Sequence, residues 1–218
     1  MSAYFVTAVG TGVGKTFTTC ALLHAARSSG RIACGFKPII SGYDAADATS
    51  DTAQIILASG GTANVDEISP WRFAAPLSPH RAAALEGQTL DVKALIEWSR
   101  ARATGEGLTL IEGVGGVMVP LTNSQTSMDW MAALGLPVIL VTGSYLGSIS
   151  HTLTALHALR ARGLHIAALV MSETEGSTVT LDEAIAGLAH FIADIPLRIV
   201  QPRVSSWREA TAIHSLEL

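Results

Sequence analysis

Six runs of apolar, β-prone residues recur along the chain, separated by segments with helical periodicity. The runs cover Tyr4–Val9, Ile32–Lys37, Leu108–Glu112, Val138–Thr142, Ile166–Met171 and Leu197–Val200. The first five are apolar throughout instead of alternating with polar residues, which is typical of strands covered on both faces. The pattern therefore predicts an α/β fold with a doubly wound, mostly parallel sheet and helices on both faces.

Helical periodicity fills most of the intervals between these strands. It predicts helices over Lys15–Ser28, Thr52–Ser59, Val92–Ala103, Ser127–Leu134, Ile149–Arg162 and Leu181–Ile192. Gly30, Gly135 and Gly163 each follow a helical run and precede a strand, as C-terminal capping glycines do. Because ligands of such sheets bind beyond the carboxyl ends of the strands, the polar residues at those ends are the candidates for function.

Composition narrows the class of protein. The 218 residues are 49% hydrophobic and 15% charged, and no linker-like segment divides them, so we expect a single domain over residues 1–218. The formal charge of −4, with 14 Lys and Arg that form no run, argues against a nucleic-acid partner. The start of the chain leaves no room for a signal peptide, and no apolar run reaches the roughly 18 residues of a membrane span. We expect a cytoplasmic protein without a membrane partner.

Cysteine and histidine provide no metal-binding pattern. Cys20 and Cys34 have no metal-ligand spacing, so both are expected to be buried, reduced side chains. The seven histidines form no H-E-x-x-H or comparable cluster, and we expect them to be surface or core residues.

The first strand runs into a glycine-rich turn that Gly14, Lys15 and Thr16 close as a helix begins. This arrangement is typical of a phosphate-binding loop, in which backbone N–H groups and the helix dipole face an anion. Lys15 would contact the β- and γ-phosphates and the Thr16 hydroxyl would bind Mg²⁺. The generic pattern G-x-x-x-x-G-K-[ST] has glycine where this chain has Val9, so the strand–turn–helix context supports the assignment. The alternative is a glycine-rich turn without a ligand.

Three further polar residues are candidates because of their positions. Lys37 ends the second strand shortly before Ser41, and Glu112 ends the third strand before a glycine-rich turn, where phosphate-loop proteins place a second Mg²⁺ contact. Asp51 stands at a predicted helix start. The alternatives are that Lys37 is a solvated lysine, that Glu112 is a carboxylate facing water, and that Asp51 is an acid favoured there only by the helix dipole. Since Lys15 and Lys37 are expected at strand ends outside the core, their removal is expected to cost little stability.

The order of short motifs resembles that of the dethiobiotin synthetase family. The motifs are Gly14-Lys15-Thr16, Lys37-Pro38-x-x-Ser41-Gly42, Ser50-Asp51, Phe73-x-x-Pro76-x-Ser78-Pro79-His80, Glu112-Gly113-x-Gly115-Gly116-x-x-x-Pro120-Leu121, Leu136–Val141 and Leu146-Gly147-x-Ile149-x-His151. The resemblance spans about residues 3–170. It implies a P-loop NTPase-like enzyme that uses ATP and Mg²⁺. Its other substrates would be CO₂ or bicarbonate and 7,8-diaminononanoate (diaminopelargonate), and its product would be dethiobiotin, formed through a carbamate and a carbamic-phosphoric anhydride.

The resemblance also implies roles for individual residues. The implied Mg²⁺ ligands are Thr16, Asp51 and Glu112. The implied catalytic residues are the cations Lys15 and Lys37 with the polar residues Thr11 and Ser41. The implied nucleotide contacts are Gly12, Val13, Gly14, Lys15, Thr16, Phe17, Glu112 and Ser172. The family's homodimer implies a carboxylate site supplied by the partner subunit through Gly147, Ser148, Ile149 and Ser150.

The chain departs from the family pattern at several positions. The family usually has glycine at the position of Ala8 and an acidic residue at that of Gly12. Many members carry an adenine-reading Asn where this chain has Ser172. The usual Gly-x-Ile-Pro near the C-terminus is not found in the segment Arg198–Pro202. These departures leave the recognition of the nucleotide base open.

Two other classes of protein remain to be separated from this enzyme. A ParA/MinD-like regulatory ATPase shares the fold and the end of the loop, but such proteins carry a second lysine at the position of Gly10. A nucleotide-binding scaffold without chemistry would not need Lys37 or Glu112. Phosphate release stimulated by the diamine substrate distinguishes the three.

Overall fold

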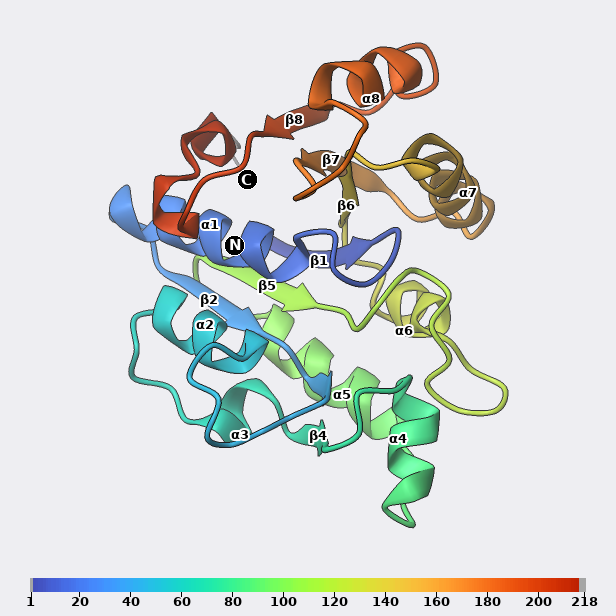
Figure 1. Cartoon of the computed structure of the whole chain (residues 1–218). Coiled ribbons are helices and arrows are strands. Elements are labelled where there is room, and N and C mark those ends of the chain that lie inside the picture. The colour runs from blue at the N-terminus through green and yellow to red at the C-terminus, as the bar shows by residue number, and fades with distance from the viewer. Residues whose placement is uncertain (1, 216–218) are drawn as a thin grey trace.

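A six-stranded parallel sheet forms the centre of the molecule (Figure 1). The computed structural model describes residues 2–215. The strands lie in the order β2-β5-β1-β6-β7-β8. Their bounds are β1 Ser2–Ala8, β2 Ala33–Phe36, β5 Leu108–Glu112, β6 Val138–Gly143, β7 Ile166–Ser172 and β8 Leu197–Gln201. The predicted α/β class with a doubly wound parallel sheet is confirmed.

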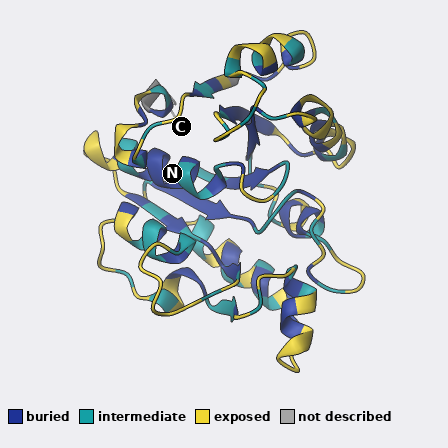
Figure 2. Ribbon diagram, viewed as in Figure 1, coloured by how far each residue is buried: buried dark blue, intermediate teal, exposed yellow. Residues whose placement is uncertain are grey.

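Helices cover both faces of this sheet and create two separate cores (Figure 2). Side chains alternate between the faces along a strand, and accordingly Phe5 of β1 belongs to one core while Val6 belongs to the other. The longer helices are α1 Lys15–Ser28, α2 Asp51–Ala58, α5 Val92–Ala103, α6 Ser127–Leu134, α7 Ser148–Ala161 and α8 Leu181–Leu188.

Several short elements were not predicted from the sequence. Strands β3 Ile39–Ser41 and β4 Trp71–Phe73 form a second, two-stranded parallel sheet. The short helices are α3 Val65–Ile68 and α4 Pro79–Leu85, and two 3₁₀ turns, η1 Trp207–Glu209 and η2 Thr211–Ser215, follow β8. These elements are three to seven residues long, which is too short to display either periodicity clearly and explains why they were missed.

Several predicted elements begin or end one or two residues away from the observed bounds, and two larger differences stand out. Helix α8 ends at Leu188 rather than Ile192, and its last four predicted residues form turns. Cys20 is buried as expected, but the expectation is wrong for Cys34, which is only half-buried because β2 is an edge strand of the sheet. No helix among residues 2–215 has the length and apolar character needed to cross a membrane.

The strand order places the carboxyl ends of β1, β2 and β5 side by side. From β1 the chain first builds β2 and β5 on one side and then β6, β7 and β8 on the other. Ligands of such sheets bind where the direction of building reverses. The loop after β1 lies at that reversal, so the fold brings the sequence-predicted phosphate loop to the expected edge.

We expect Trp130 of α6 to be a main anchor of the core behind β1. Its ring is fully buried, meets Phe5 edge-on at 4.7 Å between centroids, and donates its Nε1–H to Ser99 Oγ at 3.2 Å. Trp130→Ala should therefore lower the free energy of unfolding by about 3–5 kcal/mol. Phe191→Ala, which removes an aromatic ring that is 57% exposed, is the control and should cost much less. Urea unfolding curves measure both, and equal losses would contradict this account.

Candidate active site

The loop between β1 and α1 needs glycine at two positions. Gly12 and Gly14 have φ angles of 76° and 87°, in the left-handed region that side chains other than glycine rarely adopt. A Cβ atom at Gly14 would also lie 2.8 Å from the Ser172 Oγ atom. Gly14 is the residue before the first turn of α1, so the loop turns directly into the positive end of that helix.

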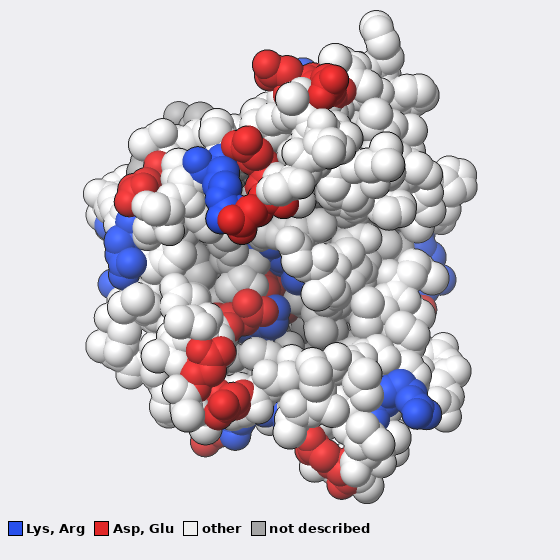
Figure 3. Space-filling view, in the orientation of Figure 1, with Lys and Arg blue, Asp and Glu red and all other residues white. Residues whose placement is uncertain are grey.

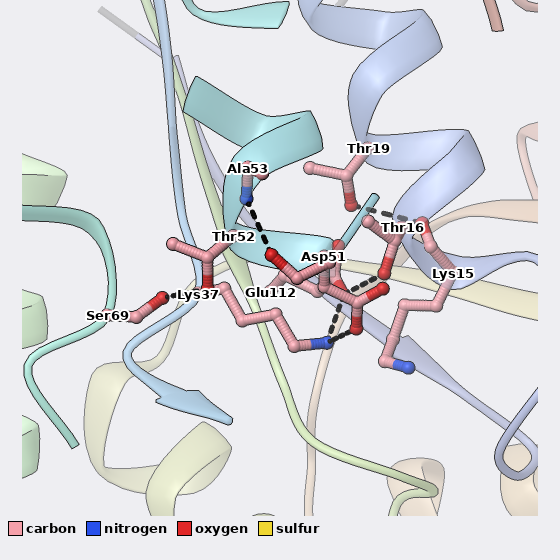
Figure 4. A network of polar contacts seen from close by, with 10 residues as sticks. Lys15, Thr16, Thr19, Lys37, Asp51, Thr52, Ala53, Ser69 and Glu112 are labelled. Atoms are coloured by element: carbon pink, nitrogen blue, oxygen red, sulfur yellow. Dashed lines mark hydrogen bonds and ion pairs between the residues drawn. The ribbon is translucent and has the colours of Figure 1, made fainter. Parts of the chain in front are cut away.

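Four polar side chains from four segments meet beside this loop (Figure 4). The Lys37 Nζ atom lies 2.6 Å from Asp51 Oδ2 and 2.6 Å from Glu112 Oε1. The Thr16 hydroxyl donates a hydrogen bond to the same Glu112 oxygen at 2.7 Å. Lys37 follows β2, Glu112 ends β5, and Asp51 and Thr16 stand in the first turns of α2 and α1. The parallel sheet thus assembles residues that lie up to 96 positions apart in the sequence.

The expectation that the two lysines lie outside the core is wrong. Lys15 is 7% exposed, Lys37 is 3% exposed, and Glu112 is fully buried. Lys37 is therefore no ordinary solvated lysine and Glu112 is no carboxylate facing water. The sequence marks both residues as strand ends, but it does not show that α2 covers the space between them. Asp51 both begins α2 and pairs with Lys37, so the two interpretations of this residue are compatible.

The pKa values of Lys15 and Lys37 are shifted in opposite directions by their shared surroundings. Burial, together with the neighbouring charge of Lys37, lowers the pKa of Lys15 to about 8. Burial alone would also lower the pKa of Lys37, but the carboxylates of Glu112 and Asp51 raise it above its ordinary value. Burial alone would raise the pKa of Asp51, and the Lys37 ammonium group lowers it instead. The paired lysine thus stays charged, while the pKa of Lys15 lies well below that of an ordinary lysine.

A cleft of about 710 Å³ opens over this cluster. Figure 3 shows it as a hollow with charged side chains at its floor. Its polar lining includes Thr11, Lys15, Lys37, Ser41 and Asp51, and its apolar lining consists of Phe17, Ile40, Pro76, Leu77, Pro79, Val114 and Val119. The cleft therefore combines charged groups with a hydrocarbon surface. Pro76, Leu77 and Ser78 precede α4, and Pro79 is its first residue. No periodicity in the sequence revealed that this segment lines the cleft.

A smaller pocket of about 380 Å³ lies on the other side of the phosphate loop. Gly12, Val13, Gly14 and Phe17 line it together with Ser172. The segment after β8 closes the pocket with Pro202, Arg203 and Val204. No motif in the sequence singles out Arg203, whose guanidinium pairs with Glu175 at 2.8 Å and whose backbone N–H donates to Glu173. In the sequence, only the position of Arg203 shortly after the end of a predicted strand indicates that it could lie at a site.

The residues Gly147–Ser150 lie apart from the cleft. Gly147, with a φ angle of 96°, precedes α7, and none of the four residues lines the cleft. The Ser148 side chain is 1% exposed, and its Oγ atom has no hydrogen-bond partner among the described residues. The adjacent Leu146 is 85% exposed. Within one chain, the structure does not bring this helix start to the lysines.

The cluster fits a magnesium ion by the chemistry of its donors. Thr16, Asp51 and Glu112 offer oxygen atoms, which Mg²⁺ prefers, and the buried Glu112 Oε2 atom has no hydrogen-bond partner in the described part of the chain. No group of three or more His, Cys, Asp or Glu residues suited to a metal occurs within residues 2–215. Mg²⁺ sites of phosphate-loop proteins use few protein ligands and take the rest from phosphates and water.

The buried pair between Lys37 and Glu112 can be tested by unfolding. Lys37→Met should lower the free energy of unfolding by about 3–5 kcal/mol, because it leaves a buried carboxylate without its cation. Adding Glu112→Gln should recover much of the loss, because a neutral amide costs less to bury than an unpaired charge. Lys93→Met is the control, since this exposed lysine lies 3.9 Å from Glu97 and should matter little. A wild-type urea midpoint for Lys37→Met would contradict the buried pair.

Comparison with known proteins identifies close relatives. A family model described as "AAA domain" matches residues 2–201. The ATP-dependent dethiobiotin synthetase of Caulobacter sp. (strain K31) is 48% identical over 210 residues, which cover 95% of this chain and 90% of that protein. The corresponding protein of Phenylobacterium zucineum is 51% identical over 180 residues, covering 80% of this chain and 77% of the relative.

Similar solved structures share the fold at low identity. The septum site-determining protein MinD of Pyrococcus horikoshii, solved with Mg-ADP, has a TM-score of 0.59 and 18% identity, and the match covers 98% of this chain and 86% of that one. At this identity the likeness concerns the fold alone, whereas the sequence relatives match at 40–51% identity along most of their length. The chain therefore belongs to the family of ATP-dependent dethiobiotin synthetases.

Proposed function

We propose that the protein closes the cyclic urea of dethiobiotin from diaminopelargonate and CO₂ at the expense of ATP. The observation that carries the proposal, in a member of this family, is that Lys15, Thr16 and Lys37 line one cleft while the buried Glu112 bonds to Thr16 and Lys37. To catalyse phosphoryl transfer, a protein mainly has to position the reactants and neutralise the charge of the phosphates. Two lysines and a set of oxygen ligands for Mg²⁺ supply both.

The proposed reaction has three steps. One amine of the diamine attacks the carbon of CO₂ and loses a proton, which gives a carbamate. A carbamate oxygen then attacks the γ-phosphorus of ATP, and ADP leaves, which gives a carbamic-phosphoric anhydride. The second amine attacks the carbonyl carbon of this anhydride and loses a proton, and phosphate leaves as the ring closes.

The chain's own residues supply charge and position in these steps. Lys15 would hold the β- and γ-phosphates, with the backbone N–H groups of Gly12 to Thr16 around them. Lys37 would face the carbamate and the transferring phosphoryl group from the floor of the cleft. Thr16, Asp51 and Glu112 would hold Mg²⁺, which supplies neutralisation of phosphate charge when bound. Thr11 and Ser41 also line the cleft and would contact the same groups.

The apolar wall of the cleft has two uses in this proposal. Ile40, Leu77 and Val119 offer a surface on which the methylene chain of the diamine can pack. They also limit the access of water to an anhydride that hydrolyses readily. On the other side of the loop, the pocket beside Phe17 and Ser172 would take the nucleoside.

We further propose that two chains form a dimer and that α7 of the partner subunit supplies the carboxylate site. The N-terminus of α7 carries positive dipole potential suited to a carboxylate, and the unpartnered, buried Ser148 Oγ lies there. The exposed Leu146 beside it suits a contact surface. Since Gly147–Ser150 do not line the cleft of their own chain, a second chain would have to bring them to it.

One assay tests the reaction directly. The protein is incubated with ATP, Mg²⁺, bicarbonate and diaminopelargonate, and the products are analysed by mass spectrometry for dethiobiotin. A regulatory ATPase of the MinD type would release phosphate without forming dethiobiotin, and a scaffold would do neither. Absence of dethiobiotin from an active, folded preparation would overturn the proposal.

The pKa of Lys15 predicts how ATP binding depends on pH. Bound phosphate favours the charged lysine, so the affinity for ATP should be constant well below pH 8 and should fall above it, as Lys15 loses its proton, by up to about tenfold per pH unit. A fluorescent ATP analogue with Mg²⁺ and without the diamine measures the dissociation constant. Lys15→Arg is the control, because arginine stays charged and should give a flat profile. A wild-type profile as flat as that of Lys15→Arg would contradict the prediction.

The shared site predicts complementation between two inactive variants. Ser148→Asp should repel the substrate carboxylate, and Lys15→Met should stop phosphoryl transfer, so each homodimer alone should be nearly inactive. Mixing after subunit exchange should give about half heterodimers with one intact site each, and hence about a quarter of the wild-type rate of dethiobiotin formation. No recovery after verified exchange would place both sites in one chain.

A further inference from the structure

The segment that follows β8 connects the smaller pocket with the outer face of α1. Its first residues, Pro202, Arg203 and Val204, line the pocket beside the phosphate loop. Its 3₁₀ turns η1 and η2 then pack against α1. Figure 1 shows this red segment beside the N-terminal part of the chain. It therefore reaches from the proposed nucleoside site to the helices α1 and α2, which carry two of the proposed metal ligands, Thr16 and Asp51.

Trp207 fixes this segment in place. The residue is 7% exposed, and its ring meets His24 of α1 edge-on at 5.5 Å between centroids. The guanidinium group of Arg208 lies 4.0 Å from the centroid of the same ring. Ala210 and Ile213, which follow, are fully buried in the same core. The indole is thus held from several sides and can fix the position of a neighbour.

That neighbour is Gln54 of α2. The Trp207 Nε1–H donates to Gln54 Oε1 at 3.0 Å, across 153 residues of sequence. The other end of the Gln54 amide points to the Ala48 carbonyl at 3.4 Å, in the loop that leads into α2. Through these two hydrogen bonds, the Gln54 amide joins the C-terminal segment both to the start of α2 and to the residues before it.

The first turn of α2 also carries Asp51. Residues three apart on a helix lie on neighbouring positions of one face, so Gln54 stands one turn beyond Asp51. The Asp51 carboxylate pairs with Lys37, but its side chain is 43% exposed, unlike that of Glu112. Burial fixes Glu112 within β5, whereas the position of Asp51 depends on how α2 is held.

We propose that Trp207 is a positioning residue for Asp51, acting through Gln54 on the start of α2. The inference rests on the proposed role of Asp51 as a ligand of Mg²⁺. Because Val204 lines the smaller pocket three residues before Trp207, the same segment links the nucleoside site to the metal site. Trp207 itself lines neither of the two pockets, so its effect is on the metal requirement and not on contact with substrate.

Trp207→Phe tests the link because it keeps an aromatic ring and removes only the N–H donor. Mg²⁺ is titrated into protein with a fluorescent ATP analogue, without diamine, so that binding is measured and no product forms. The Mg²⁺ concentration for half-maximal binding should rise about fivefold, as expected for the loss of one neutral hydrogen bond. Gln54→Met should give a similar shift, and the double variant should shift no further than the larger single one.

Two control variants separate positioning from general stability. Ile213→Val removes one methylene group from the same core and leaves the Trp207–Gln54 hydrogen bond in place, so it should leave the Mg²⁺ titration at the wild-type value although it also lowers stability. Asp51→Asn removes the carboxylate itself, so it should give the largest rise in the Mg²⁺ concentration for half-maximal binding. A wild-type titration for both Trp207→Phe and Gln54→Met, or an equal shift for Ile213→Val, would overturn the proposal. Since no product is measured, absence of dethiobiotin would refute the proposed function without deciding this test.

Discussion

The ion pair between Lys37 and Glu112 is the interaction on which the site depends. Two opposite charges lie 2.6 Å apart in a place that is almost closed to water, where neither is stable alone. The pair raises the pKa of Lys37 and keeps this lysine charged, whereas Lys15, which lies near the same groups without so close a partner, has its pKa lowered. The same residues thus contribute to stability and to the proposed chemistry, so their substitution changes both.

The parallel sheet makes this pair possible. Strands β2, β5 and β1 end side by side, so Lys37, Glu112 and the loop before Thr16 reach one point from distant parts of the sequence. Helices on both faces keep water from the strands, and α2 closes the space beside their ends. Together these elements form a cleft with a charged floor and an apolar wall, as a reaction through a labile anhydride requires.

Some of this architecture could be predicted from the sequence and some could not. Six strands are visible as apolar runs and six helices by their periodicity, and the position of Glu112 and Lys37 at strand ends is visible in the same pattern. The burial of Lys37 could not be predicted from the sequence, because it depends on a pairing with Glu112 across 75 residues. The strands β3 and β4 are too short for a periodic signal. The contact of Trp207 with Gln54 is equally invisible, because it joins two segments that no local rule connects.

The most direct test of this account is a crystal structure with Mg²⁺ and a non-hydrolysable ATP analogue. We expect the Thr16 hydroxyl and the Glu112 carboxylate to lie near the metal, at about the 2.0–2.1 Å of direct Mg²⁺ ligands or one water molecule away. We also expect Lys37 Nζ to have moved from Glu112 toward the γ-phosphate. A metal bound elsewhere, with the Lys37–Glu112 pair unchanged at the floor of the cleft, would contradict the account.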